Sequence, residues 1–182
     1  MRIAQLLGFT THDLRIAHLN LYGTNPVLLV EDPSPHWQEV LNGQREMACA
    51  VTPGGLLVAS DESFPQMFSK GGQPANLWRW ALFSEETRTV LVNWDKRWAP
   101  DLLAELRLAR YRYPADDTVR ALYADAVRDP ALQQIVAEPS RGLNGQAHPL
   151  RHPMHGEGTA RFMAARAVGV SVLTILFESA AQ

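Results

Sequence analysis

The stretch VSVLTILFE, residues 170 to 178, decides the fold. It is far shorter than the roughly 20 apolar residues that cross a bilayer, and its residues suit a β-strand. Both alternating sets of side chains are largely apolar: Val170, Val172, Thr174 and Leu176 on one side, and Leu173, Ile175 and Phe177 on the other. Because a strand that is apolar on both faces is normally covered on both faces, we predict that it is central in its sheet.

Four further segments are predicted to be strands: Met47–Thr52, Leu56–Ser60, His148–Met154 and Thr159–Ala167. Glycine-containing turns join strands 1 and 2, 3 and 4, and 4 and 5 into hairpins. If the central fifth strand also pairs with the first, the spatial order is 2-1-5-4-3. That is the antiparallel order of a PAS-like domain, an α+β fold whose helices cover one face of the sheet and leave space for a ligand cavity.

The segment between the second and third strands is predicted to be a helical insert. Asn76 can cap a helix over Leu77–Phe83, and Ser84 can cap the next one. An apolar stripe at helical spacing follows: Trp80, Phe83, Thr87, Val90, Leu91 and Trp94. Further helices are expected around Pro100, from Asp117 and from Asp129. Residues 1–33 are expected to form an N-terminal helical arm and linker, and residues 34–182 the PAS-like domain.

Composition narrows the function classes. The 182-residue chain carries a net charge of about −2, which argues against a free-standing nucleic-acid binder. Its single cysteine, Cys49, excludes an intramolecular disulfide and favours a reducing compartment. The N-terminal residues lack the apolar core of a signal peptide. We therefore expect a soluble cytoplasmic protein of bacterial type, with no membrane segment, no direct nucleic-acid contact and no cofactor.

Three motifs resemble the ligand-binding domain of MmyB-like transcription regulators. The first is PANLWRW at 74–80, followed by VLVNW at 90–94. The second is GLLVASDESFPQMF at 55–68, and the third is HPMHG at 152–156. The resemblance runs from about residue 34 to the C-terminus. It implies a PAS-like fold with a cavity for a fatty-acid-like ligand.

The chain departs from the family pattern in three places. Ser60-Asp61 stands where an Ala-Asn or Trp-Asn pair is usual, His155 replaces an apolar residue, and almost no tail follows Glu178. Members of the family usually begin with a helix-turn-helix, and residues 1–23 resemble only its tail. Either the chain has been cut short, or the natural protein has lost its DNA-reading head.

Nine side chains are predicted to contact the ligand: Met67, Phe68, Asn76, Arg79, Trp80, Phe83, Trp94, His152 and Met163. Methionine and the aromatic residues suit an apolar wall, although such residues also fill ordinary cores. Arg79 can meet a carboxylate or phosphate, or else pair with Glu85 or Asp95. Asn76 is most simply a helix cap.

Other reactive side chains have structural explanations beside the functional ones. His148, His152 and His155 lie close in sequence, but on a strand the third points away from the other two, so we expect no metal site. His152 can be a structural hydrogen-bonding group, contact a ligand head group or transfer a proton. Cys49 is expected to be a small core residue. Asp61 and Glu178 can act as acids or bases only if they are buried.

Three functions remain open from the sequence. The first is a sensor for a small apolar ligand, fatty-acid-like or another metabolite, in a regulator. The second is an enzyme of cyclase or isomerase type, recruited from this fold, with His152, His155, Asp61 and Glu178 as acid–base groups. The third is an interaction module in which residues 1–46 form a dimerisation arm; a homodimer is compatible with the first function too.

Overall fold

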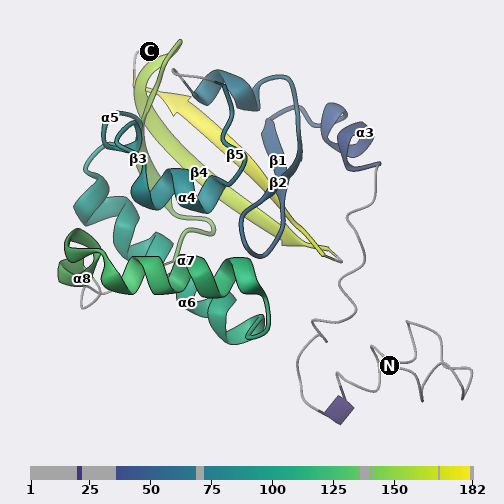
Figure 1. Ribbon diagram of the computed structural model, residues 1–182. Helices are drawn as coiled ribbons and strands as arrows, with labels where there is room; N and C mark the ends of the chain where they lie inside the picture. Colours follow the sequence, from purple (N-terminus) through teal and green to yellow (C-terminus); the bar gives the residue numbers. More distant parts are fainter. Residues whose placement is uncertain are drawn as a thin grey trace, which may run out of the picture.

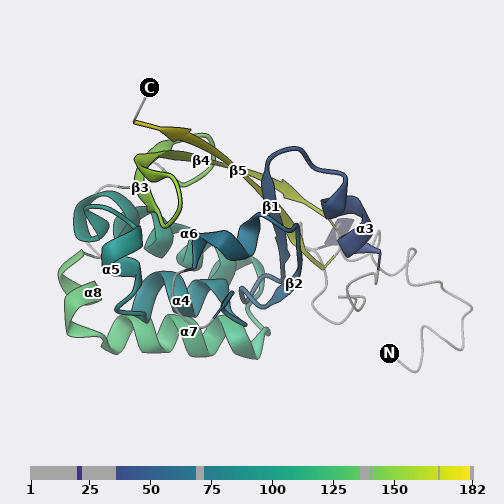
Figure 2. The same ribbon diagram turned by 90° about the horizontal axis from the view of Figure 1, so that it is seen from above.

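The structure is a computed structural model, and it describes residues 20–21, 36–68, 72–135, 140, 142–167 and 169–180. Apart from positions 20 and 21, the predicted N-terminal arm and linker at 1–33 lie outside these residues. A five-stranded antiparallel sheet carries the fold (Figure 1). Most helices of the domain lie on one side of this sheet (Figure 2).

The strand order confirms the prediction made from the central strand. The strands are β1 (Met47–Val51), β2 (Leu57–Ser60), β3 (Ala147–His152), β4 (Gly156–Arg166) and β5 (Ser171–Ser179). They are arranged as β2-β1-β5-β4-β3. β5 pairs with β1 on one side and with β4 on the other. The last strand is therefore central, and one of its two neighbours is the strand that is farthest from it in sequence.

Both faces of β5 have a partner, as its two apolar sets require. Leu173 and Phe177 pack against the main core between sheet and helices. Val172 points to the opposite face and packs with Ala48 and Ala50 of β1. There the helix α3 (Trp37–Asn42) covers β1 and β2 with its buried residue Leu41. The alternation of side chains along a strand thus separates two hydrophobic clusters.

The helical insert combines several short elements with two longer helices, α6 (Ala99–Arg112) and α7 (Asp117–Arg128). Between β2 and β3 lie η2 (Phe64–Met67), α4 (Leu77–Phe83), α5 (Thr87–Val90), η3 (Trp94–Trp98), α6, α7 and α8 (Pro130–Ile135). Asn76 caps α4, as predicted: its side chain accepts a hydrogen bond from the Arg79 backbone N–H and donates one to the Gly54 carbonyl. These bonds tie the start of α4 to the turn between β1 and β2.

The apolar stripe from Trp80 to Trp94 does not lie on one continuous helix. Asn93 adopts a left-handed conformation, with φ of 54°, and the chain then makes a π-helical turn. The left-handed residue lets the chain change direction, so Trp94 and Trp98 still reach the same core as Trp80. Within the described part of the chain, no helix is long and apolar enough to span a membrane.

Candidate ligand-binding site

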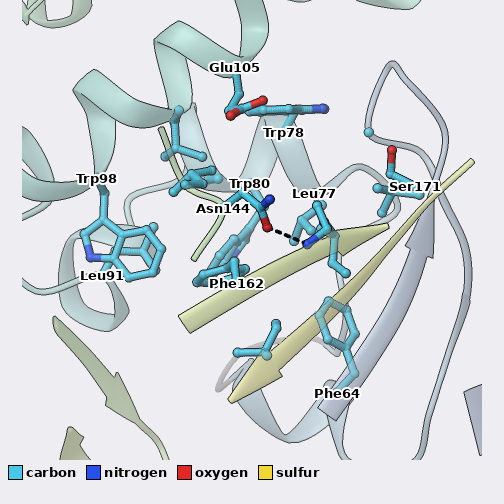
Figure 3. Close-up of a pocket in the computed structure, with 18 of the residues that line it drawn as sticks. Phe64, Leu77, Trp78, Trp80, Leu91, Trp98, Glu105, Asn144, Phe162 and Ser171 are labelled. Atoms are coloured by element: carbon cyan, nitrogen blue, oxygen red, sulfur yellow. Dashed lines mark hydrogen bonds between the residues drawn. The ribbon is translucent and has the colours of Figure 1, made fainter. Parts of the chain in front are cut away.

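A cavity of about 420 Å³ lies between the sheet and the helices (Figure 3). Its volume is within the range typical of small-molecule sites. The sheet side is formed mainly by Val51, Phe162, Ala164, Leu173 and Ile175, and the helical side mainly by Phe64, Met67, Leu77, Trp78, Trp80, Ala81, Leu91, Trp98 and Leu102. The surroundings of a bound molecule are therefore predominantly apolar.

The sheet floor follows from strand alternation and register. Phe162, Ala164 and Arg166 occupy alternate positions of β4, and all three line the cavity. Across the sheet, Phe162 is opposite Ile175, while Ala164 is opposite Leu173. Ala164 carries only a methyl group where Phe162 carries a ring, so the side chain at position 164 occupies less of the space above the sheet than the one at position 162.

An aromatic stack forms the wall around η2 and α4. The ring of Phe68 lies edge-on to Phe64, with 5.2 Å between ring centroids, and edge-on to Trp80 at 4.9 Å. The Trp80 indole N–H donates to the carboxylate of Glu86 over 3.0 Å. Both rings that face the cavity, Phe64 and Trp80, are thus held in place by contacts made behind them.

Trp98 forms the wall toward β3 and is only 2% exposed. Its indole N–H donates to the Pro149 carbonyl over 2.9 Å, which fixes the orientation of the ring. Its ring meets Phe162 edge-on at 5.4 Å and lies 4.7 Å from the imidazole of His148. Trp98 and Leu102 are one helical turn apart, and Glu105 follows within the next turn. The side chain that ends η3 and these two side chains of α6 therefore all face the cavity.

Trp78 rests on the backbone of the β1–β2 turn. Gly55 has φ of +79°, and a Cβ there would lie only 2.0 Å from Cδ1 of Trp78. Glycine is therefore required twice, by the backbone conformation and by the close approach of the ring. The glycine-containing turn predicted between the first two strands, Pro53-Gly54-Gly55, thus positions a cavity-lining tryptophan that the predicted site did not include.

Polar groups are concentrated among a few lining residues. They are Thr52, Glu105, Asn144, Arg166 and Ser171. Asn144 is fixed, because its side-chain oxygen accepts the Ala164 backbone N–H over 2.8 Å (dashed in Figure 3). An apolar cavity with a small set of polar groups can orient a ligand that has one polar end.

Of the nine side chains predicted to contact a ligand, Met67 and Trp80 line the cavity. Phe68 lies behind Phe64 and Trp80 in the aromatic stack. Arg79 forms an ion pair of 2.5 Å with Asp125 of α7, a partner other than the expected Glu85 or Asp95. The Arg79 guanidinium also lies 5.8 Å from the ring centroid of Phe83. Arg79 therefore joins α4 to α7, while Phe83 packs against the main core.

The remaining predicted contacts also lie outside the cavity lining. Asn76 acts as the α4 cap. The buried Trp94 donates its indole N–H to the Ala81 carbonyl over 2.8 Å, and the Arg88 guanidinium lies over its ring. Met163 is 47% exposed and occupies the opposite face of β4 from Phe162. These positions belong to the framework around the cavity.

The histidines of β3 and its turn occupy separate environments. His148 contacts Trp98, whereas His152 stacks on the exposed His155 at 4.5 Å and on Phe177 at 5.4 Å. Nδ1 of His152 accepts the Met154 backbone N–H over 3.2 Å. Burial lowers the pKa of His152, and the neighbouring His155 lowers it further. Within the described segments, no group of three or more His, Cys, Asp or Glu side chains can hold a metal ion.

The other acid–base candidates do not line the cavity either. Asp61 is buried, and its carboxylate accepts the backbone N–H groups of Ala48, Ser63 and Phe64. Glu178 is exposed near the end of β5. Burial raises the pKa of Cys49, and the nearby charge of Asp61 raises it further, so its thiol is a poor nucleophile. Asp61 therefore holds backbone groups in place, and Cys49 is a core residue.

The fold and its cavity define a ligand-binding α+β domain. The sequence profile of the family described as MmyB-like transcription regulator ligand binding domain matches residues 33–181. The chain therefore belongs to this family, as the three motifs indicated. No curated protein matches the chain significantly.

Proposed function

We propose that this domain senses a small molecule with a predominantly apolar body, and that binding takes place in the cavity between the sheet and α4, α6 and η3. The observation that carries the proposal is the cavity itself, about 420 Å³ in volume and walled by aromatic and aliphatic side chains. A long-chain fatty acid and a neutral apolar metabolite both satisfy it. A cytoplasmic location and a homodimer are parts of the same proposal.

The cavity is suited to sensing because its walls come from separate elements. Phe64 and Met67 belong to η2, Trp98 to η3, and Phe162 to β4. A ligand that contacts all of these side chains links elements that the cavity otherwise holds apart. Binding can thereby favour one arrangement of the helices over another, which is the physical requirement for a regulator to respond.

Two neighbouring alanines of β4 allow a matched test. Ala164 lines the cavity, whereas Ala165 is paired with Val172 on the other face of the sheet. Phenylalanine at position 164 is expected to fill part of the cavity. We expect wild type and Ala165→Phe to bind 1-dodecanol in a calorimetric titration, and Ala164→Phe to bind at least about tenfold more weakly.

The proposal is wrong if wild type takes up no apolar probe, or if Ala164→Phe binds as wild type does while remaining folded by circular dichroism. Native mass spectrometry of the purified protein adds a second readout, because a co-purified ligand appears as a discrete mass adduct. The enzyme hypothesis has no specific contact in its favour, since His152, His155, Asp61 and Glu178 all lie away from the cavity lining.

A further inference from the structure

Two opposite charges line the predominantly apolar cavity, and they do not pair with each other. Glu105 comes from α6 and Arg166 from the end of β4. No ion pair joins them, although both residues border the same space. Glu105 is partly buried, while Arg166 is exposed. Of the two charged side chains, Glu105 is therefore the less accessible to water.

The carboxylate of Glu105 has no hydrogen bond or ion pair to the residues that the structure describes. It lies close to Gly142, where an added Cβ would be 3.5 Å from Oε1. Figure 3 draws it beside Trp78 at one end of the cavity. A molecule that fills the cavity at this end removes water from the carboxylate. That loss of hydration is unfavourable unless the molecule supplies a hydrogen-bond donor or a positive charge.

Arg166 has the complementary requirement. Its cross-strand neighbour on β5 is Ser171, a small residue that also lines the cavity and leaves space beside the arginine. Among the described residues, no carboxylate pairs with the Arg166 guanidinium. A guanidinium binds carboxylate and phosphate groups through two parallel N–H donors. An acidic group on the ligand can therefore contact Arg166 at the outer side of the site.

We propose that the sensed molecule is an amphiphile with a zwitterionic head group, whose cationic nitrogen binds Glu105 and whose acidic group binds Arg166, while its apolar tail fills the cavity. This inference rests on the proposed function and adds the ligand class. A simple carboxylate head satisfies Arg166 but brings a like charge toward Glu105. A simple amine satisfies Glu105 and leaves Arg166 without a partner.

The test compares probes that share a twelve-carbon chain and differ in the head group. They are 2-aminododecanoic acid, dodecanoic acid, dodecylamine and 1-dodecanol, each titrated below its micelle concentration by calorimetry. We expect wild type to bind the amino acid about tenfold more tightly than the alcohol, because charge-assisted hydrogen bonds are stronger than neutral ones. Added salt is expected to reduce this difference, since Arg166 is exposed.

Two substitutions separate the two charges. Glu105→Gln is expected to weaken both amine-bearing probes about tenfold, and Arg166→Gln both carboxylate-bearing probes by a smaller factor because water screens it. For each variant, the affinity for 1-dodecanol is the reference against which the loss for the charged probes is measured. The matched controls are Glu85→Gln, at an exposed glutamate between α4 and α5, and Arg161→Gln, which is on β4 but does not line the cavity.

The outcomes separate this inference from the cavity proposal. If 1-dodecanol binds and all four probes agree within about threefold, the head-group inference is wrong and the apolar cavity stands. The same conclusion follows if dodecanoic acid binds most tightly, or if Glu105→Gln leaves the amine-bearing probes unchanged. If no probe binds to wild type, both the inference and the proposed function are overturned.

Discussion

Nε2 of His148 lies 3.6 Å from Oδ2 of Asp101, and both side chains are buried where β3 meets α6. On the other side of the ring, Nδ1 lies 3.0 Å from the backbone carbonyl of Arg97. Because a carbonyl can only accept, Nδ1 carries a hydrogen. The neutral ring then presents a lone pair at Nε2, which has no hydrogen-bond partner in the described part of the structure.

This arrangement predicts a loss of stability in mild acid. Burial lowers the pKa of His148 below its usual 6.5, even though Asp101 and the Arg97 carbonyl act in the opposite direction. As the pH falls below 6.5, the unfolded chain therefore binds the proton before the folded one does. Stability is fully present above 6.5 and is lost as the pH falls through the lower pKa of the folded state. Thermal melts between pH 8 and pH 5 measure this loss.

The variant His148→Asn tests the assignment of the effect to this residue. Its amide can still donate to the Arg97 carbonyl, but it does not titrate, so the dependence of the melting temperature on pH becomes shallower. Part of the slope remains, because the pKa of His152 is also lowered. The exposed His36→Asn serves as the control. An unchanged slope in His148→Asn would show that another group is responsible.

Gly55 and Gly156 form a matched pair for separating backbone strain from side-chain contact. Both have positive φ, but a Cβ on Gly156 meets nothing within 4 Å, whereas one on Gly55 would overlap Trp78. We expect Gly156→Ala to lower the free energy of unfolding by about 1 kcal/mol. Gly55→Ala is expected to cost about 3 kcal/mol or more, since Trp78 must also move. Urea titrations measure both; equal losses would contradict the proposed contact.

Asp61 holds the start of η2 and therefore the position of Phe64. Its buried carboxylate accepts backbone N–H groups on both oxygens. In Asp61→Asn, one oxygen becomes an amide that can no longer accept, and a buried N–H loses its partner. We expect a loss of about 3 kcal/mol in the free energy of unfolding. The exposed neighbour Glu62→Gln should change stability little, and a similar small effect at Asp61 would refute the structural role.

Cys49 provides a single-thiol probe of how the core opens. It is the only cysteine of the chain and is fully buried on β1. Burial and the charge of Asp61 both raise the pKa of its thiol, so the native protein contains almost no thiolate at pH 8. We expect the native protein to react with iodoacetamide more than about a hundredfold more slowly than the urea-unfolded chain. Rapid labelling of the native state would mean that β1 opens readily.

The sheet could be predicted because its information is local and periodic. The two apolar sets of β5 indicate cover on both faces and hence a central strand, for which pairing with β1 is one possible arrangement, and the structure has this pairing. The helical insert was harder to predict from the sequence. A stripe at helical spacing says which residues share a core, but not that Asn93 would turn left-handed and separate Trp94 from the helix that carries Val90.

The cavity lining was harder to predict than the fold for a related reason. The family motif at 74–80 identifies α4 but not the direction of each side chain, so the predicted site includes Arg79 and omits Trp78. Phe162 and Leu173 come from strands that are distant from α4 in sequence. Alternation along β4, with Phe162, Ala164 and Arg166 on one face, is the signal that could have found the sheet side of the site.

The contact between Asn144 and Ala164 has a consequence for self-association. β3 pairs with β4 only up to Arg161, so the next part of β4 would otherwise be a bare strand edge. Asn144 and Gly145 supply the missing partners, with Gly145 N–H donating to the Phe162 carbonyl over 2.7 Å. Asn144 and Gly145 thus also cover this edge of β4 and prevent it from pairing with a strand of another molecule. A ligand that enters by displacing Asn144 would expose unpaired backbone groups of β4 to other molecules. Ligands that can enter while the Asn144–Ala164 hydrogen bond stays intact are therefore favoured.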